Sequence, residues 1–323
     1  MYITQQEVEK FIKLVSSYET IIIHRHQRPD PDALGSQLGL KHLLSKAFPQ
    51  KRVLAAGSKS RGLEWLGAMD KVSKEDYAQA LVIICDTANE ERIDGKYYSL
   101  GQKIIKIDHH PLVEDFGDLQ IIYPQASSTS EIIGQLAQAK SELLPMDAQI
   151  ARLLYAGIVG DTGRFMFRST SADTFKIAAW LSQYDFDRYD INNQFQLLSY
   201  QQAKFEGYFF DHLQINDSGV AWLSIPIALR QQYGLTEEDT NLFVNLPSRI
   251  RDVQTWVIFV EQDTQPSYWR CRIRSKGSSI NQIASLHEGG GHPLASGANV
   301  YSEEEKMILI QELSQVSLAD SKA

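Results

Sequence analysis

The chain has 323 residues, of which 43% are hydrophobic and 22% charged, so it holds enough apolar side chains for about two folded domains and is not mainly disordered. Its 40 acidic residues outnumber its 32 basic ones, and the net charge of −8 argues against a protein that binds duplex nucleic acid through a basic face. Without a secretory signal or an apolar run of membrane-spanning length, and with only 2 cysteines, we expect a cytoplasmic protein that does not bind membranes.

The first half of the chain alternates short apolar runs with segments of helical periodicity. The runs predicted as strands are Thr20–Arg25, Arg52–Ala56, Ala80–Cys85, Lys103–Ile107 and Leu119–Tyr123. The segments predicted as helices are Ala33–Phe48, Ser128–Leu144, Asp147–Gly160 and Ser171–Gln183. Continuous apolar strands separated by helices are typical of a parallel sheet with helices on both faces, so the predicted fold class is α/β.

The second half begins where this periodicity weakens, between Asp187 and about Phe210, and we interpret residues 186–211 as a helical linker. Beyond it we predict strands at Gly219–Ile225, Val253–Glu261 and Ser267–Arg274, helices at Ser279–His287 and Ser302–Val316, and a glycine-rich loop at Gly289–Gly291. The predicted domains are therefore a parallel-sheet domain over residues 1–185 and a smaller α/β domain with a mixed sheet over residues 212–323.

Aspartate and histidine side chains gather at the ends of predicted elements in four separate segments. These segments are His26-x-x-x-Asp30-x-Asp32, Asp86 after the run ALVIIC, Asp108-His109-His110 after KIIKI, and Asp161 in Gly160-Asp161-Thr162-Gly163. Each segment alone has an ordinary explanation as a helix cap, a turn or a surface loop. In open α/β sheets, however, ligands bind beyond the carboxyl ends of the strands, so we expect the side chains to converge there.

The chemistry of this set predicts a metal site. Carboxylates mixed with imidazoles suit Mn²⁺, with Mg²⁺ or Co²⁺ as substitutes, and the absence of cysteine at these positions argues against structural zinc. One shared carboxylate would hold two ions ~3.5–4 Å apart, an arrangement that activates water and neutralises a phosphoryl group.

Taken together, the four segments resemble the motifs of the DHH superfamily of phosphoesterases, and the resemblance covers nearly the whole chain. The later run Gly-Gly-Gly-His-Pro-Leu-Ala-Ser-Gly-Ala at residues 289–298 resembles the glycine-rich signature of the DHH-associated domain. Size and order are most similar to the bacterial nanoRNase and pAp-phosphatase type, in which pAp is adenosine 3′,5′-bisphosphate. Some relatives of this type cleave linear diadenylate (pApA) and some cleave cyclic di-AMP.

The resemblance implies roles for individual residues. It implies one ion held by His26, Asp30 and Asp86, and a second held by Asp32, Asp86, His109 and Asp161, so that Asp86 is shared. It also implies that His110 faces the scissile phosphate and that Asp108 orients a histidine, which makes Asp86, Asp108 and His110 the expected catalytic residues.

Further residues are expected to bind substrate besides His110. Ser127, Ser128 and Thr129 open a predicted helix, whose N-terminus either is simply capped or binds a phosphate or a ribose hydroxyl. In the second domain, Gly290 and Gly291 offer backbone N–H groups for an anion, and Arg274 and His292 are expected to contact it, although a solvated basic strand is the ordinary alternative.

The function implied is a two-metal phosphoesterase. It would act as a 3′–5′ exoribonuclease that converts very short RNA, including pApA, to 5′-mononucleotides, and as a nucleotidase that converts pAp to AMP. Three alternatives remain open: a main role on cyclic di-AMP or pApA, an inorganic pyrophosphatase (which the Gly-Gly-Gly-His run disfavours), and a nucleotide-binding regulator without turnover. Both a monomer and a homodimer are compatible with the sequence.

Overall fold

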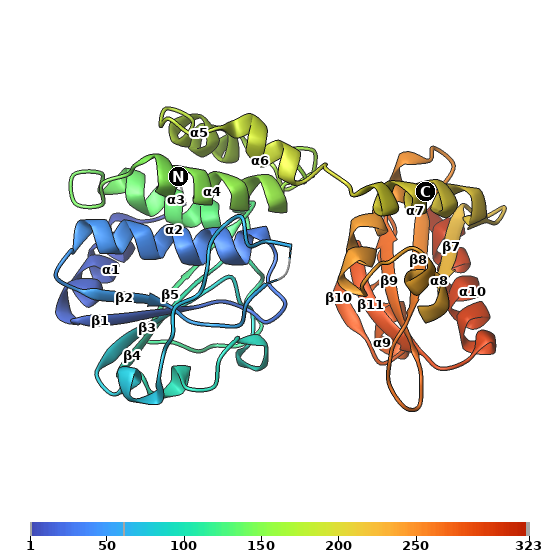
Figure 1. Cartoon of the computed structure of the whole chain (residues 1–323), viewed down its shortest axis with the longest axis horizontal. Helices are drawn as coiled ribbons and strands as arrows, with labels where there is room; N and C mark the ends of the chain where they lie inside the picture. Colours follow the sequence, from blue (N-terminus) through green and yellow to red (C-terminus); the bar gives the residue numbers. More distant parts are fainter. Residues whose placement is uncertain (1, 61, 321–323) are drawn as a thin grey trace. The chain divides into compact units, whose positions relative to one another are not determined.

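The computed structural model describes residues 2–60 and 62–320 and divides the chain into two compact units, Met1–Gln196 and Leu197–Ala323 (Figure 1). The division falls inside the segment predicted as a linker. Within the part of the chain that the structure describes, none of the helices has the length and apolar character needed to cross a membrane.

The first unit is built on a five-stranded sheet with the strand order β2-β1-β3-β4-β5. Its strands are β1 (Thr20–His24), β2 (Arg52–Ala55), β3 (Ala80–Cys85), β4 (Lys103–Asp108) and β5 (Leu119–Ile122). All of its neighbouring strands pair in parallel, which confirms the predicted parallel sheet. Because β1, β3 and β4 are adjacent and point the same way, their carboxyl ends lie side by side.

Helices cover one face of this sheet and short 3₁₀ helices lie over the other. The α-helices are α1 (Gln5–Ser17), α2 (Pro31–Ala47), α3 (Thr129–Ala139), α4 (Ala148–Asp161), α5 (Ala172–Leu181) and α6 (Arg188–Gln194), and the 3₁₀ helices are η1 (Lys74–Tyr77), η2 (Glu90–Arg92) and η3 (Tyr98–Leu100). Alternate strand residues enter the two layers: Ile21 and Ile83 pack with the α-helices, whereas Ile22 packs in a smaller core with Tyr77.

The helix α1 was not predicted, although local signals for it are present. Thr4 and Glu7 form a capping box at its start. Val8, Phe11 and Val15, spaced as on one helix face, are buried in the main core. The helix α3 is shorter than predicted: it ends at Ala139, and the buried Leu144, which extended the apolar pattern, lies beyond it.

The second unit contains a mixed six-stranded sheet with the order β10-β11-β9-β8-β7-β6, as predicted for this domain. Its strands are β6 (Gln214–Ile215), β7 (Val220–Ile225), β8 (Thr255–Glu261), β9 (Trp269–Ser275), β10 (Gly290–His292) and β11 (Ala295–Val300). One face packs on α9 (Asn281–Leu286) and α10 (Glu303–Asp320), and the other on α7 (Tyr200–His212), α8 (Ile227–Gln232) and the 3₁₀ segments η4 (Glu238–Phe243) and η5 (Leu246–Arg249).

The predicted glycine-rich loop is in fact mostly strand. Gly290 to His292 form β10, which pairs in an antiparallel hairpin with β11 at the edge of the sheet. Gly291 has φ of 137°, a backbone conformation that glycine adopts at little cost.

Close backbone contact between α2 and α4 fixes the positions of these two helices beside the carboxyl edge of the sheet. A Cβ atom added to Gly35 in α2 would lie 2.6 Å from the carbonyl oxygen of Leu153 in α4. A Cβ atom added to Gly157 in α4 would lie 2.8 Å from Oδ1 of Asp32. The absence of side chains at both positions brings Asp32, in the first turn of α2, and Asp161, at the end of α4, to the same place.

We predict that Gly35→Ala destabilises the protein by about 1–3 kcal/mol, because the new methyl group meets backbone that cannot move alone. Gly207→Ala, in the exposed part of α7 where a Cβ atom would meet nothing within 4 Å, should instead be neutral or stabilise by up to about 1 kcal/mol. Denaturant unfolding of both variants checks this, and an unchanged midpoint for Gly35→Ala would contradict the packing described.

Candidate metal centre

The side chains of the centre come from the carboxyl ends of three neighbouring strands and from two helices. His26 follows β1, Asp86 follows β3, and His109 follows β4. Asp30 caps α2, where its Oδ1 accepts a hydrogen bond from the N–H of Ala33 at 2.9 Å. Asp32 and Asp161 complete the set from α2 and α4, so the fold brings together stretches that are up to 135 residues apart, from 26 to 161.

Asp86 lies in the middle of the cluster. Its Oδ2 is 3.4 Å from Nε2 of His26, and its Oδ1 is 3.4 Å from Nε2 of His109. The imidazole of His26 is also 3.6 Å from Asp30, and that of His109 is 3.1 Å from Asp161. The two oxygens of one carboxylate therefore face two separate groups of donors.

The described residues contain three sets of side chains, and within each set the potential ligand atoms lie within 4.8 Å of one another. These sets are His26, Asp30 and Asp86; Asp32, His109 and Asp161; and Asp86, His109 and His110. Every residue predicted as a metal ligand belongs to at least one set. Nitrogen and oxygen donors without a sulfur ligand suit a divalent cation such as Mn²⁺ or Mg²⁺, so the donor set fits the predicted cofactor class.

Ion pairing shifts the pKa values of Asp86 and its histidines. Burial alone would raise the pKa of Asp86, but hydrogen bonds from His109 and His26 and their positive charge hold it well below its ordinary value. Burial alone would lower the pKa of His26, but Asp30 and Asp86 raise it to about 11. Protons on the imidazoles thus offset part of the negative charge of the carboxylates, and a bound cation would supply this positive charge in their place.

Two other carboxyl groups of the cluster, those of Asp32 and Asp161, have raised pKa values. Burial, followed by the negative charges of Asp86 and Asp161, raises the pKa of Asp32 well above its ordinary value. Burial also raises the pKa of Asp161 to about 6, although a hydrogen bond from His109 acts in the opposite direction. Buried carboxylates crowded in this way require further positive charge to stay ionised together, which is what metal ions supply.

His110 is held by the aspartate that precedes it by two residues. Oδ1 of Asp108 accepts hydrogen bonds from Nδ1 of His110 at 2.8 Å and from its backbone N–H at 3.1 Å. Asp108 is buried, and its other oxygen has no hydrogen-bond partner among the described residues. Because the carboxylate engages Nδ1, it places a proton there and leaves Nε2 as the nitrogen that can exchange a proton with a substrate.

The start of α3 differs from its predicted use. Ser127, Ser128 and Thr129 are 1%, 0% and 0% exposed, so a substrate cannot reach their side chains in this structure. Ser127 donates to the carboxylate of Glu131, and Ser128 caps the helix. The N–H groups expected to face a phosphate are engaged by protein: those of Thr129 and Ser130 donate to Asp32.

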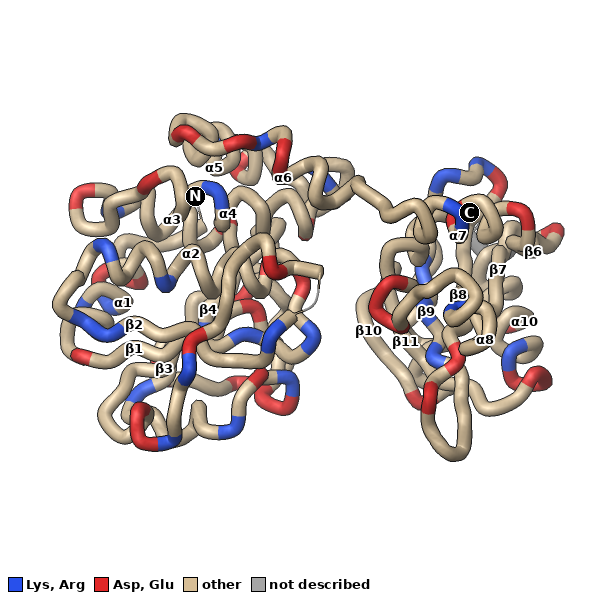
Figure 2. The backbone as a smooth tube through the Cα atoms, in the orientation of Figure 1, with Lys and Arg blue, Asp and Glu red and all other residues tan. Residues whose placement is uncertain are grey.

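Of the predicted substrate residues of the second unit, Arg274, His292 and Gly290 share one face of its sheet, whereas Gly291 lies in the row of Ser296 and Ile273 on the other. Arg274 is opposite Ala295 on β11, and Ala295 is opposite His292 on β10, so the three form one row across adjacent strands. The next row contains Arg272, Gly297 and Gly290. Figure 2 shows the basic positions along β9. In the second row two glycines, which have no side chain, stand beside Arg272.

The sequence analysis did not predict the ion pair between Arg25, the residue before His26, and Asp94. The fully buried guanidinium of Arg25 donates to Asp94 at 2.7 Å, to the carbonyl oxygen of His26 at 2.9 Å and to that of Ser58 at 2.6 Å. This contact ties the end of β1 to two loops and fixes the backbone that carries His26. An arginine that ends an apolar strand was the available signal, but nothing in the sequence marked Asp94 as its partner.

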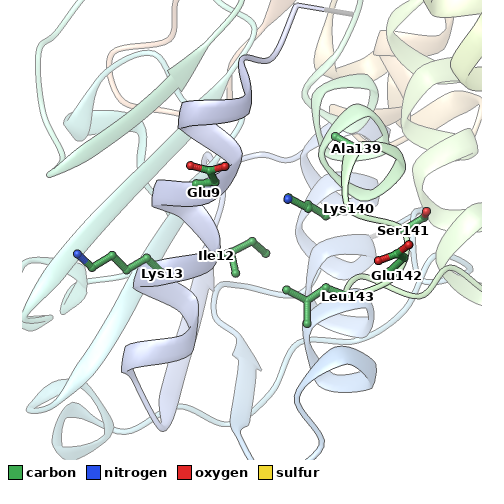
Figure 3. Close-up of a pocket in the computed structure, with 8 residues that line it drawn as sticks. All are labelled: Glu9, Ile12, Lys13, Ala139, Lys140, Ser141, Glu142 and Leu143. Carbon is green, nitrogen blue, oxygen red and sulfur yellow. The ribbon is translucent and has the colours of Figure 1, made fainter.

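A separate hollow lies between α1 and the segment after α3 (Figure 3). It is lined by Glu9, Ile12, Lys13, Ala139, Lys140, Ser141, Glu142 and Leu143. None of these residues belongs to the metal centre, and the hollow offers no group of converging ligands.

Comparison with known proteins gives consistent results over most of the chain. The model of the DHH family, N-terminal domain, matches residues 20–158, and the DHHA1 domain model matches residues 220–317. A Streptococcus mutans protein named "Probable bifunctional oligoribonuclease and PAP phosphatase NrnA" is 48% identical over 299 residues, 93% of this chain and 95% of its own length.

Two further matches extend this result. The Bacillus subtilis protein named "Bifunctional oligoribonuclease and PAP phosphatase NrnA" is 42% identical over 305 residues, 94% of this chain and 96% of its own length. The crystal structure of an exopolyphosphatase-related protein from Bacteroides fragilis superposes with a TM-score of 0.87 at 26% identity and covers 97% of this chain and 96% of its own.

We predict that Asp86→Asn abolishes Mn²⁺ binding to the metal-free protein at concentrations that saturate the wild type, because a carboxylate that faces both donor groups loses its charge. Isothermal titration with Mn²⁺ measures this. The control is Asp118→Asn: Asp118 pairs with Lys103 at the opposite end of β4 and should leave binding unchanged. Equal Mn²⁺ affinity in wild type and Asp86→Asn would refute the assignment.

Proposed function

The chain belongs to the DHH family, and from that premise we propose that it is a metal-dependent phosphoesterase that converts very short oligoribonucleotides to 5′-mononucleotides and pAp to AMP. The observation that carries the proposal is the placement of Asp86, whose two oxygens face two groups of nitrogen and oxygen donors. The names of the Streptococcus and Bacillus relatives, which cover the same two domains, support this choice of substrates.

In this proposal, two Mn²⁺ ions bind at the centre. His26, Asp30 and Asp86 would hold one ion, and Asp32, Asp86, His109 and Asp161 the other. Bound ions of this kind supply positive charge for the phosphoryl oxygens and make a water molecule easier to deprotonate.

His110 would act on the substrate itself. Asp108 fixes its ring through Nδ1 at 2.8 Å, which holds the imidazole in one orientation when both of its nitrogens are protonated. Such an imidazole donates a proton from Nε2 to the oxygen that leaves phosphorus when the phosphoester bond breaks. Burial of Asp108 limits solvent access to this pair and strengthens the interaction.

The second unit would supply the groups that bind the rest of the substrate. Arg274 and His292 lie in one row of its sheet, and Gly290 and Gly291 precede His292 on the same edge strand, where Gly291 is exposed. A guanidinium and an imidazole beside accessible backbone form a suitable surface for a phosphate. These groups would hold a terminal phosphate or nucleotide of a short substrate.

We predict that, with Mn²⁺, the protein releases 5′-mononucleotides from very short RNA and AMP from pAp, and that excess chelator stops both reactions until Mn²⁺ is restored. Rates on short RNA, pAp, pApA and cyclic di-AMP, measured side by side by chromatography, test this. Asp118→Asn should retain the wild-type rates. Binding of pAp in Mn²⁺ without product would favour the regulator instead, and much faster turnover of cyclic di-AMP would favour the alternative phosphodiesterase.

We predict that His110→Asn lowers kcat by about 10²–10⁴-fold, the usual contribution of general acid–base catalysis, with little change in Mn²⁺ affinity. Asp108→Asn should lower kcat by a smaller factor, because the imidazole remains but its orientation is less well fixed. Steady-state kinetics and Mn²⁺ titration of the same preparations separate the effects. If His110→Asn lost Mn²⁺ affinity as strongly as Asp86→Asn, His110 would be a metal ligand instead.

A further inference from the structure

We propose that Thr129 is a positioning residue that orients Asp86 and Asp32 together and so couples the two ion positions of the proposed centre. The inference rests on the proposed function in that it assumes a metal centre, but it concerns a residue that is not itself a ligand. It assigns to the hydroxyl at the start of α3 a task different from substrate binding.

Thr129 contacts two candidate ligands with two different groups. Its hydroxyl donates a hydrogen bond to Oδ1 of Asp86 at 3.2 Å, and its backbone N–H donates to Oδ2 of Asp32 at 2.7 Å. The N–H of Ser130 donates to the other oxygen of Asp32 at 2.9 Å. Both oxygens of Asp32 are thereby fixed, and the side chain of Thr129 links that fixed carboxylate to Asp86.

The contact with Thr129 is shorter than those of Asp86 with the two imidazoles, which are 3.4 Å each. The torsion between the Cβ atom and the carboxylate of an aspartate is broad, so hydrogen bonds decide which way the oxygens face. The backbone of Asp86 also has a positive φ of 55°, an uncommon conformation for a residue with a side chain. A small rotation of this carboxylate would move Oδ1 away from His109 and Oδ2 away from His26 simultaneously, which would disturb both ion positions.

The protein, and not a substrate, fixes the position of Thr129. The side chain of Ser128 accepts a hydrogen bond from the N–H of Glu131, which caps the helix. The buried carboxylate of Glu131 accepts hydrogen bonds from Ser127 at 2.7 Å and from Thr174 of α5 at 2.8 Å. Since Thr129 is 0% exposed, its hydroxyl is available only to groups inside the protein.

The test compares three variants of the full chain after removal of metal. Thr129→Val keeps the shape and the backbone N–H but removes the hydroxyl, whereas Thr129→Ser keeps the hydroxyl. The matched control is Thr174→Val, which removes a hydroxyl from an equally buried threonine that contacts Glu131 and no candidate metal ligand. Thermal unfolding and circular dichroism of each variant record any loss of structure.

We expect isothermal titration with Mn²⁺ to show affinity lowered by about 10–100-fold in Thr129→Val, as for other residues that orient metal ligands. Thr129→Ser should bind within a few-fold of the wild type, and Thr174→Val should lose stability but not affinity. In turnover assays, Thr129→Val should need more Mn²⁺ for half-maximal rate, while KM for pAp at saturating Mn²⁺ stays close to that of the wild type.

Several outcomes would overturn the inference: unchanged Mn²⁺ affinity in Thr129→Val, an equal loss in Thr174→Val, or no rescue by Thr129→Ser. If Thr129→Val does not fold, Thr129→Ala takes its place with the same expectation. Failure of the proposed function looks different, since a wild type that binds Mn²⁺ but hydrolyses neither RNA nor pAp leaves the affinity comparison intact. A wild type without Mn²⁺ affinity would refute both proposals.

Discussion

Mutual repulsion among buried carboxylates is the constraint around which the first unit is arranged. Asp32 and Asp86 are almost fully buried and lie close to Asp161, a grouping that is costly in a medium of low dielectric constant unless positive charge or hydrogen-bond donors accompany it. Two compensations are visible in the structure. The imidazoles of His26 and His109 face Asp86, and the N-terminus of α3 directs two N–H groups at Asp32, where the helix dipole favours a negative charge.

The order of the parallel strands and the packing of the helices bring these groups together. Parallel strands end at one edge of a sheet, so residues that follow β1, β3 and β4 meet without long loops. Close contact of α2 and α4 at Gly35 and Gly157 lets helix ends reach the same edge. The ion pair of Arg25 and Asp94 fixes the backbone just before His26. Much of the unit thus serves to keep a charged cluster in one geometry, which is the condition for binding metal ions closely together.

The second unit places basic side chains on one face of its sheet. Its sheet buries Cys271 and Ile273 of β9 against α9 and α10, while the alternating Arg272 and Arg274 point to the opposite face. Glu237 and Thr240 engage Arg272, so its guanidinium is partly satisfied within the protein. On the β11 side these arginines stand opposite Ala295 and Gly297, whose small or absent side chains leave the guanidinium groups room to contact a phosphate, in agreement with the proposed role.

The amino-acid sequence alone determined the parallel sheet, the residues at its carboxyl edge and the DHH resemblance, because apolar runs and strand-end residues are local features. The helix α1 was equally local in its capping box and was overlooked. Other features depended on contacts distant in sequence. His24 ends β1 two residues before His26, yet only the fold shows that it bonds to Tyr77 and to the backbone of Asp94 instead of the centre. Likewise, hydroxyl residues at a helix start suit capping, phosphate binding or support of a carboxylate equally well. Tertiary structure decided among these, because it is the packing of α2 against α3 that brings Asp32 to those N–H groups and buries Thr129 beside Asp86.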